Sequence, residues 1–278
     1  MAGSLDGRNI LITGIADEQS LALIIARRLR EEGARLICAG LGETQHQGAV
    51  SPATQRFLRE SRERFEKVVH ENLGGDTTTI IFDASIEESV VDAANELKDI
   101  GLSVDGVLHS IALDRTIRGE AVKPLLDVSR QEFMDCMNVS AYSLIAITRA
   151  LHQKGRLTSG ASIVSLSYLG AERIMSHPYR NIGVAKAALE RITRELAIEL
   201  GRTSGIRLNA IRFSPYSSSR AGGAIPGLED AAARANEIAP LGNATPEALA
   251  REIAYLMHPE TMITGETRHV DGGYHVMG

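Results

Sequence analysis

The chain has 278 residues, with 30 Lys and Arg against 35 Asp and Glu, a net charge of −5 and 44% hydrophobic residues. This length suits one large domain, and the mildly acidic balance argues against binding of nucleic acid or of an anionic membrane surface. Apolar stretches such as residues 21–26 are far shorter than the roughly 20 residues that span a membrane. Residues 1–8 lack the apolar segment of a secretory signal, so we expect none.

Cysteine and histidine usage predicts neither a disulfide framework nor a metal. The two cysteines, Cys38 and Cys136, form no CxxC pair and favour a reducing, cytoplasmic compartment. The eight histidines form no HExxH motif and no Cys/His cluster. His269 and His275 flank a turn, and we interpret them as surface residues rather than ligands.

Strands and helices are predicted to alternate along the whole chain. A short apolar run at residues 9–13 ends at Gly14, and Ser20 then opens a helix that Gly33 closes. Further strands are predicted at residues 35–40, 78–82, 104–111, 161–166, 207–211 and 266–270, and further helices at 51–73, 86–100, 129–151, 179–200 and 246–257. Such alternation predicts an α/β Rossmann fold: one doubly wound parallel sheet with helices on both faces, in a single domain over residues 1–278. The long loops 41–53 and 214–227 are expected to be functional or mobile.

Two positions at strand ends are candidate cofactor contacts. Ligands of a doubly wound sheet bind at the carboxyl ends of the strands, where the first strand-to-helix turn presents unpaired N–H groups. That turn keeps Gly14 but lacks GxGxxG, and Ser20 is equally well explained as a helix N-cap. Asp83 ends the third strand and either accepts a hydrogen bond from an adenine amino group or caps the helix at Ile86.

A tyrosine and a lysine are spaced to face one pocket. Tyr179 and Lys186 are seven positions apart, which returns a helix to nearly the same face after two turns. Because helical side chains lean toward the N-terminus, the Lys186 ammonium reaches back toward Tyr179 and leaves room for a ribose. A surface lysine and a half-buried tyrosine would explain an isolated pair, but not the residues around this one.

The motifs together resemble one branch of the short-chain dehydrogenase/reductases. The chain has neither the TGxxxGxG nor the YxxxK motif of ordinary members at the required places, but it is similar over nearly its whole length to the enoyl-acyl-carrier-protein reductases. The matching positions are Thr13-Gly14, Ser20-Leu21-Ala22, His109-Ser110-Ile111, Ser140-Ala141-Tyr142-Ser143, residues 167–172, Tyr179 with Lys186, residues 207–211 and residues 269–273.

The resemblance implies roles for these residues. Tyr179 is expected to hydrogen-bond the thioester carbonyl of a trans-2-enoyl substrate, Lys186 to hold the nicotinamide ribose and Tyr168 to line the site of hydride transfer. The expected cofactor-binding residues are Gly14, Ser20, Leu21, Leu41, Asp83, Ala84, Ser110, Ile111, Lys186, Pro215, Tyr216, Ser218 and Ser219. The substrate is expected to contact Asp114, Tyr168, Tyr179 and Tyr216. An acyl carrier protein is the implied partner, and the implied assembly is a homotetramer built on helices 129–151 and 179–200.

Three departures from the family pattern concern the pocket and the cofactor. Tyr216 places a phenol where the family has a small aliphatic residue, and Ser218 or Ser219 replaces the usual donor. Asp114 and Arg115 either face solvent or line the site, in which case the substrate is more polar, as in a specialised metabolic pathway. The loop 41–53 has no Lys or Arg, and Glu43 would repel a 2′-phosphate, so NADH is favoured; Arg56 and Arg59 keep NADPH as the alternative.

Two other classes of function stay open at the level of the sequence. A carbonyl reductase or alcohol dehydrogenase can use the same scaffold, although the seven-residue spacing of Tyr179 and Lys186 argues against it. A protein that binds the cofactor without catalysis would bind NADH and be indifferent to loss of the Tyr179 hydroxyl. The motifs leave open the acyl chain length and the choice between carrier protein and coenzyme A.

Overall fold

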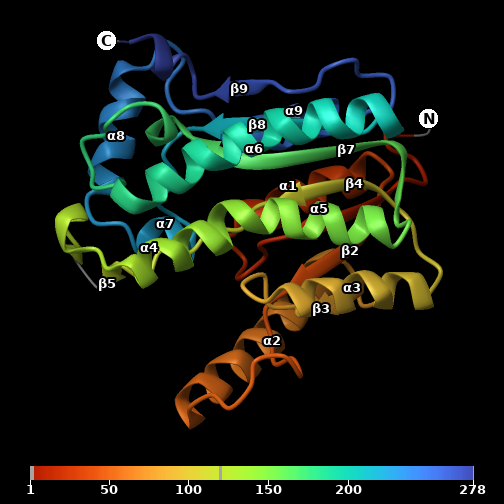
Figure 1. Ribbon diagram of the computed structural model, residues 1–278. Coiled ribbons are helices and arrows are strands. Elements are labelled where there is room, and N and C mark those ends of the chain that lie inside the picture. The colour runs from red at the N-terminus through yellow and green to blue at the C-terminus, as the bar shows by residue number, and fades with distance from the viewer. Residues whose placement is uncertain (1–2, 119–120, 278) are drawn as a thin grey trace.

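The computed structural model describes residues 3–118 and 121–277 and is built on one seven-stranded parallel sheet (Figure 1). The strands lie in the order β3-β2-β1-β4-β7-β8-β9. From β1 the chain adds β2 and β3 on one side and then returns to add β4 on the other side, so the switch point of the strand order lies between β1 and β4. Their bounds are β1 Asn9–Thr13, β2 Arg35–Gly40, β3 Thr78–Ile81, β4 Val104–His109, β7 Leu157–Tyr168, β8 Arg207–Phe213 and β9 Thr267–Val270. This is the doubly wound sheet that the sequence predicts, with each predicted strand present.

Helices cover both faces of the sheet. On one face lie α1 (Leu21–Glu31), α2 (Pro52–Leu73) and α9 (Pro246–Met257); on the other lie α3 (Glu87–Asp99), α5 (Ser143–Gln153) and α6 (Arg180–Ser204). Successive residues of β1 divide between two separate hydrophobic clusters, since Ile10 and Ile12 pack against the first helices and Leu11 against the second. No helix in the described ranges combines the length and apolarity needed to cross a membrane.

The helix predicted at residues 129–151 is one helical stretch with a different turn in its middle. α4 (Arg130–Met137) begins at a capping box between Ser129 and Glu132 and continues through a π-helical turn, η2 (Asn138–Tyr142), into α5. The wider turn holds two buried hydroxyls at the end of β4: Ser143 Oγ pairs with His109 Nε2 at 2.8 Å, and Ser140 holds the following loop. The π-turn therefore positions the segment that follows β4.

Several short elements of the structure were not predicted from the sequence. α7 (Arg220–Gly223) and α8 (Leu228–Ile238) follow β8, and β5 (Ile117–Arg118) pairs with β6 (Ala121–Val122) in a small hairpin. α8 buries Leu228, Ala231 and Ala235, a helical spacing that was present in the sequence but is too short and alanine-rich to stand out. α6 begins at Arg180, so Tyr179 is its N-cap residue rather than its first helical residue.

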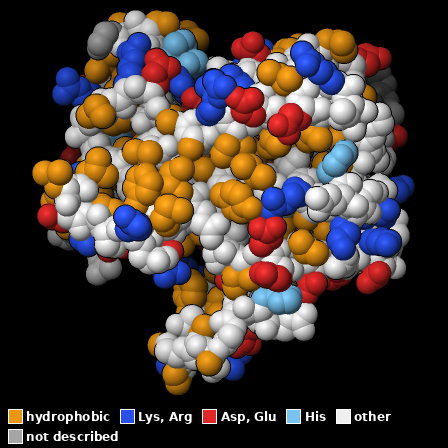
Figure 2. Space-filling view, viewed as in Figure 1, with side chains coloured by type: hydrophobic (Ala, Val, Ile, Leu, Met, Phe, Trp, Pro, Cys, Tyr) orange, Lys and Arg blue, Asp and Glu red, His pale blue; other side chains and the backbone are white. Residues whose placement is uncertain are grey.

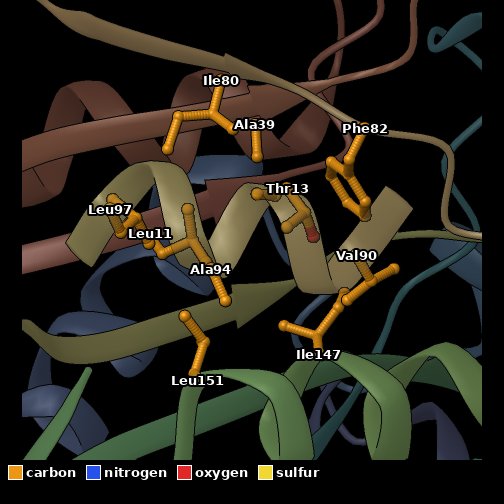
Figure 3. A pocket seen from close by; sticks show the side chains of 11 residues that line it. Leu11, Thr13, Ala39, Ile80, Phe82, Val90, Ala94, Leu97, Ile147 and Leu151 are labelled. Carbon is orange, nitrogen blue, oxygen red and sulfur yellow. The ribbon is translucent and has the colours of Figure 1, made fainter. Parts of the chain in front are cut away.

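A small apolar cavity lies between the sheet and the helices α3 and α5 (Figure 3). It measures about 20 Å³ and is lined by aliphatic and aromatic side chains together with Thr13. The Thr13 hydroxyl donates to Leu108 O at 2.9 Å and accepts from Ser110 N at 3.2 Å. Its polar atom is thus satisfied inside the core, and the cavity is a packing defect rather than a ligand site.

Candidate active site

The candidate active site lies where the strand order reverses, at the carboxyl ends of the strands. A cleft of about 310 Å³ opens there. Six predicted site residues line it: Leu21, Asp114, Tyr168, Tyr179, Tyr216 and Ser219. The other predicted residues lie outside its wall: Gly14, Ser20, Leu41, Asp83, Ala84, Ser110, Ile111, Lys186, Pro215 and Ser218. Its apolar cover includes Ile182, Ile225 and Leu228, which sequence reasoning did not single out.

Gly14 closes the turn after β1 against the end of β4. Its φ of +89° belongs to the left-handed region, and a Cβ at this position would overlap the carbonyl oxygen of Ser110. Any side chain at Gly14 would therefore push the first turn away from its neighbouring strand. The glycine leaves the backbone open at the point where a ligand meets the N-terminus of α1.

Ser20 folds the loop that precedes α1. It occupies the N-cap position, but its side chain makes no capping bond. Its hydroxyl instead accepts from Ala16 N and Asp17 N, each at 3.0 Å, and donates to Asp17 Oδ1 at 3.0 Å. Ser20 is thus the N-cap residue of α1, as one interpretation of the sequence has it, but without the side-chain bond of a capping serine. Leu23 N donates to Ser20 O, which leaves the N–H groups of Leu21 and Ala22 for an anion.

Tyr168 and Tyr179 meet at the wall of the cleft. Their rings lie edge to face with centroids 5.0 Å apart. Burial raises the pKa of both phenols above the ordinary value, so each hydroxyl keeps its proton and acts as a donor. The Tyr168 hydroxyl is buried and has no hydrogen-bond partner within the described chain. A donor without a partner at the wall of a cleft is available to a ligand.

His177 lies against both tyrosines and was not predicted. Its ring centroid is 5.6 Å from that of Tyr168 and 5.9 Å from that of Tyr179. The side chain is 3% exposed, and burial lowers its pKa to about 4, so the imidazole is neutral near pH 7. A lone histidine before Pro178 carries no sequence pattern that would place it between two catalytic candidates.

Lys186 is a buried residue of α6 and lies outside the wall of the cleft. Its Nζ donates to Leu166 O at 2.8 Å, which is its only acceptor within the described residues. An ammonium carries three N–H donors, so two remain for a ligand. Burial lowers the pKa of Lys186 to about 8, which keeps the ammonium mostly charged at neutral pH. Tyr168 and Tyr179 are in contact, whereas Lys186 lies outside the wall of the cleft, so the grouping of Lys186 with the two tyrosines around one pocket stays a prediction.

The segment after β8 closes over the first turn. The Tyr216 hydroxyl donates to Gln19 O at 3.1 Å, and its ring lies 6.3 Å from that of Phe213. Ser219 is the N-cap of α7 and accepts from Gly222 N at 3.1 Å, whereas Ser218 is exposed. Ser219 thus caps the N-terminus of α7. Tyr216 forms part of the cleft wall and ties this segment to the loop before α1.

Asp83 anchors two neighbouring loops. Its Oδ1 accepts from Ser85 N at 2.9 Å and from Ser85 Oγ at 2.6 Å, while its Oδ2 accepts from Gln47 Nε2 at 3.1 Å. The carboxylate therefore caps a turn before α3 rather than the helix at Ile86. Gln47 belongs to the loop 41–53, which is tethered to the domain at this point. His46 of the same loop contacts Asp92 Oδ2 at 2.7 Å.

Asp114 and Arg115 point to different surroundings. Asp114 is 9% exposed and lines the cleft. Arg115 has a side chain that is 64% exposed and contacts Asp135 at 4.0 Å. Of the two alternatives drawn from the sequence, the acid lines the site and the base faces solvent.

A buried ion pair lies directly beneath Tyr168. Arg212 Nε donates to Glu190 Oε1 at 2.8 Å and its terminal nitrogen donates to Glu190 Oε2 at 2.6 Å. Ser167 Oγ donates to the same Glu190 Oε1 at 2.6 Å, and Arg212 also contacts Glu172. This network joins β7, β8 and α6, and so fixes the strand end that carries Tyr168. Sequence reasoning missed it because its members are far apart in the chain.

His269 and His275 are half-buried partners of one carboxylate, rather than the surface residues that the sequence suggests. Their rings stack at 3.8 Å, and His275 Nδ1 lies 2.9 Å from Asp271 Oδ1. His269 Nδ1 lies 3.6 Å from Asp271 Oδ2. Asp271 is 4% exposed and also accepts from the backbone N–H groups of Gly273 and His275. The group fastens the C-terminal segment to the end of β9.

The chain matches a family model over most of its length. The model is described as enoyl-(acyl carrier protein) reductase and matches residues 14–275. The NADH-dependent enoyl-acyl-carrier-protein reductase FabI of Bacillus subtilis is 34% identical, and the match covers 98% of each chain. The NADPH-dependent FabI of Staphylococcus aureus strain NCTC 8325 is 32% identical over 99% of each chain.

Solved structures share the fold over nearly the whole chain. The enoyl-acyl-carrier-protein reductase (NADH) of Aquifex aeolicus superimposes with a TM-score of 0.83 at 32% identity and covers 99% of each chain. A FabI–NADH complex from Alistipes finegoldii gives a TM-score of 0.82 at 26% identity, over 99% of this chain and 90% of the other.

Proposed function

The chain belongs to the enoyl-acyl-carrier-protein reductase family, and we propose that Tyr179, Lys186 and Tyr168 carry out its reaction. That reaction is the NADH-dependent reduction of the α,β double bond of enoyl thioesters in fatty acid synthesis. The observation that carries the assignment of residues is the meeting of the two phenols at the cleft wall. The buried Lys186 supports it, because its ammonium bonds Leu166 O on β7, the strand that ends at Tyr168.

The residues at the strand ends fit a dinucleotide. Gly14 lets the first turn pack against the carbonyl of Ser110, where a Cβ would not fit, and the N-terminus of α1 offers N–H groups to a diphosphate. Two free donors of Lys186 suit the hydroxyls of the nicotinamide ribose. Near the end of β2, Glu43 is exposed and would repel a 2′-phosphate, in agreement with the use of NADH. Arg56 and Arg59 are exposed on α2.

When bound, NADH supplies the hydride that adds to the β-carbon of the substrate. Negative charge then develops on the thioester oxygen, because electrons of the double bond move onto the conjugated carbonyl. Tyr179 keeps its proton and donates a hydrogen bond to that oxygen, which stabilises the enolate. Loss of one such donor costs about 10²–10³ in rate in enzymes that use oxyanion stabilisation.

Lys186 and Tyr168 position the reacting groups. The Lys186 ammonium orients the ribose and, as a nearby positive charge, favours a polarised Tyr179 hydroxyl. Tyr168 closes the wall beside Tyr179 and excludes water, since its ring is 8% exposed. Protonation of the enolate at the α-carbon completes the saturated product.

The substrate is carried by an acyl carrier protein, as the family implies, and we propose a homotetramer as the assembly. Apolar side chains gather on the face formed by α4, α5 and α6 (Figure 2). Met134, Val184 and Ile198 are 55%, 40% and 55% exposed on these helices. Exposed apolar groups on adjacent helices are suited to a symmetric interface. Light scattering on the purified protein tests this, and a monomer would contradict it.

We also propose a cytoplasmic location. Cys38 and Cys136 are both free and buried, as is usual for proteins kept in reducing compartments.

The experiment that tests the proposed function measures NADH oxidation with trans-2-enoyl thioesters on an acyl carrier protein. Turnover that needs Tyr179 supports the proposal. NADH binding without turnover of any enoyl thioester would contradict it.

A further inference from the structure

A carboxylate lies in the wall of a cleft that otherwise suits an acyl chain. Asp114 lines the same cleft as the two tyrosines and is 9% exposed. Around it the wall is apolar and includes Leu113, Ile117, Ile182, Ile225 and Leu228. A charged group in such a position disfavours a plain hydrocarbon chain, because the chain would displace water from the carboxylate without forming a hydrogen bond to it.

Only one of the two carboxylate oxygens has a structural task. Asp114 Oδ1 accepts from Thr116 N at 2.9 Å and from Thr116 Oγ1 at 2.7 Å, which closes a local turn. No hydrogen bond or ion pair within residues 3–118 and 121–277 involves Asp114 Oδ2, and this oxygen keeps some contact with solvent in the cleft. Asparagine or serine could form the same turn without a charge, so the turn alone does not explain an acid here.

Ser140 fixes the loop that carries the Asp114 carboxylate. Leu113 N donates to Ser140 Oγ at 2.9 Å, and Ser140 Oγ donates to Leu113 O at 3.0 Å. Ser140 is fully buried in the π-helical turn η2. The loop that carries Asp114 is therefore held at both its amide and its carbonyl. An acceptor that is held in place loses its water when a ligand fills the cleft, so it gains most from a ligand that brings its own donor.

We propose that Asp114 is a specificity residue that selects enoyl thioesters whose acyl chain carries a hydrogen-bond donor, a hydroxyl or an amine. The inference rests on the proposed function, since it places the thioester at Tyr179 and the acyl chain along the wall that holds Asp114. The donor on the chain pairs with Asp114 Oδ2, while Oδ1 stays on Thr116. The unsubstituted alkyl chains of fatty acid synthesis remain substrates, but they leave Oδ2 unpaired and desolvated and bind less well.

The test compares trans-2-enoyl thioesters of four to eight carbons that differ only at the end of the chain: methyl, hydroxyl or amino. For the wild type, kcat/KM at one chain length should be about tenfold or more higher for the hydroxyl or amino substrate than for the methyl one. The chain length at which the preference is greatest reports the distance between Tyr179 and Asp114. The ratio of kcat/KM between the hydroxyl and the amino substrate shows which of the two donors the site prefers.

Two variants separate recognition from the local turn. Asp114→Asn keeps the turn acceptor and removes the charge, so it should lose any preference for the amino substrate and reduce that for the hydroxyl one. Thr116→Val weakens the turn but leaves the carboxylate, and it should keep the wild-type order of substrates. Equal kcat/KM for all three chain ends, unchanged in Asp114→Asn, would overturn the proposal while enoyl reduction remains. Absence of turnover with every thioester would instead count against the proposed function.

Discussion

The aromatic rings of Tyr168 and Tyr179 meet edge to face, 5.0 Å apart, although the two residues are eleven positions apart in the chain. One ring comes from the end of β7 and the other from the residue before α6. Gly170 makes the contact possible, because a Cβ there would overlap the Tyr179 ring. The contact between the two rings therefore depends on the absence of a side chain at Gly170.

Replacement of Tyr179 by Phe removes the donor to the enolate oxygen. We expect kcat to fall by about 10²–10³, because the developing charge loses its hydrogen bond. The affinity for NADH should stay within a factor of about two to three, which a fluorescence titration would measure. Tyr168→Phe is the matched control, since it removes a hydroxyl that has no partner in the described chain, and its effect should be smaller. Unchanged kcat in Tyr179→Phe would contradict the role of this hydroxyl as the donor to the enolate oxygen.

The pH dependence of cofactor use should report Lys186. Burial lowers its pKa to about 8, so the ammonium is charged below that pH and neutral above it. We expect kcat/KM for NADH to be constant below about pH 8 and to fall above it, since the neutral amine loses its attraction for the cofactor. Lys186→Met should have a low kcat/KM without this inflection. A wild-type profile that is flat through pH 9 would contradict the assignment.

The ion pair of Arg212 and Glu190 should contribute to stability mainly through the cost of breaking it. Glu190→Gln removes the buried charge partner of Arg212 and leaves only the half-exposed Glu172, and we expect a loss of about 3 kcal/mol in the free energy of unfolding. Ser167→Ala removes one hydrogen bond to the same carboxylate and should cost about 1 kcal/mol. Urea denaturation measures both, and equal losses in the two variants would show that the charge pair is not the dominant interaction.

Acid should destabilise the protein through His109. Burial lowers the pKa of this histidine to about 3, whereas an unfolded histidine has a pKa of about 6.5. Below about pH 6.5 the unfolded chain takes up a proton that the folded chain does not, so stability falls by about 1.4 kcal/mol per pH unit for this group. Between about pH 6.5 and 5, before most carboxylates titrate, His109→Gln should show a smaller slope than the wild type. Identical slopes would contradict this account.

Gly14 and Gly7 form a matched pair of glycines. Both have positive φ, +89° and +73°, but a Cβ at Gly7 meets nothing within 4 Å whereas one at Gly14 overlaps Ser110. Gly7→Ala should therefore cost only about 1 kcal/mol in stability from backbone strain. Gly14→Ala should cost more and should also raise the KM for NADH, because the cofactor turn must move. An equal effect of both substitutions on the KM would contradict the role of Gly14.

The sequence predicts the sheet well because its strands are continuous apolar runs between clear turns. It also predicts Tyr179 and Lys186, because one helical spacing relates them. The pair of Arg212 and Glu190 and the position of His177 arise only when β7, β8 and α6 are packed together, so no local pattern reports them. Asp114 shows the limit most clearly: its spacing left solvent and cleft equally open, and the anchor at Ser140 decided between them.

The central claim is that the chain reduces a carbon–carbon double bond next to a thioester, and the position of the transferred hydride tests it most directly. NADH labelled with deuterium at the transferred position is oxidised in the presence of a trans-2-enoyl thioester on an acyl carrier protein, and the product is analysed by mass spectrometry. We predict one saturated acyl thioester per NADH oxidised, with the deuterium on the β-carbon. Deuterium on the carbonyl carbon, or oxidation of NADH with no saturated thioester, would contradict the account.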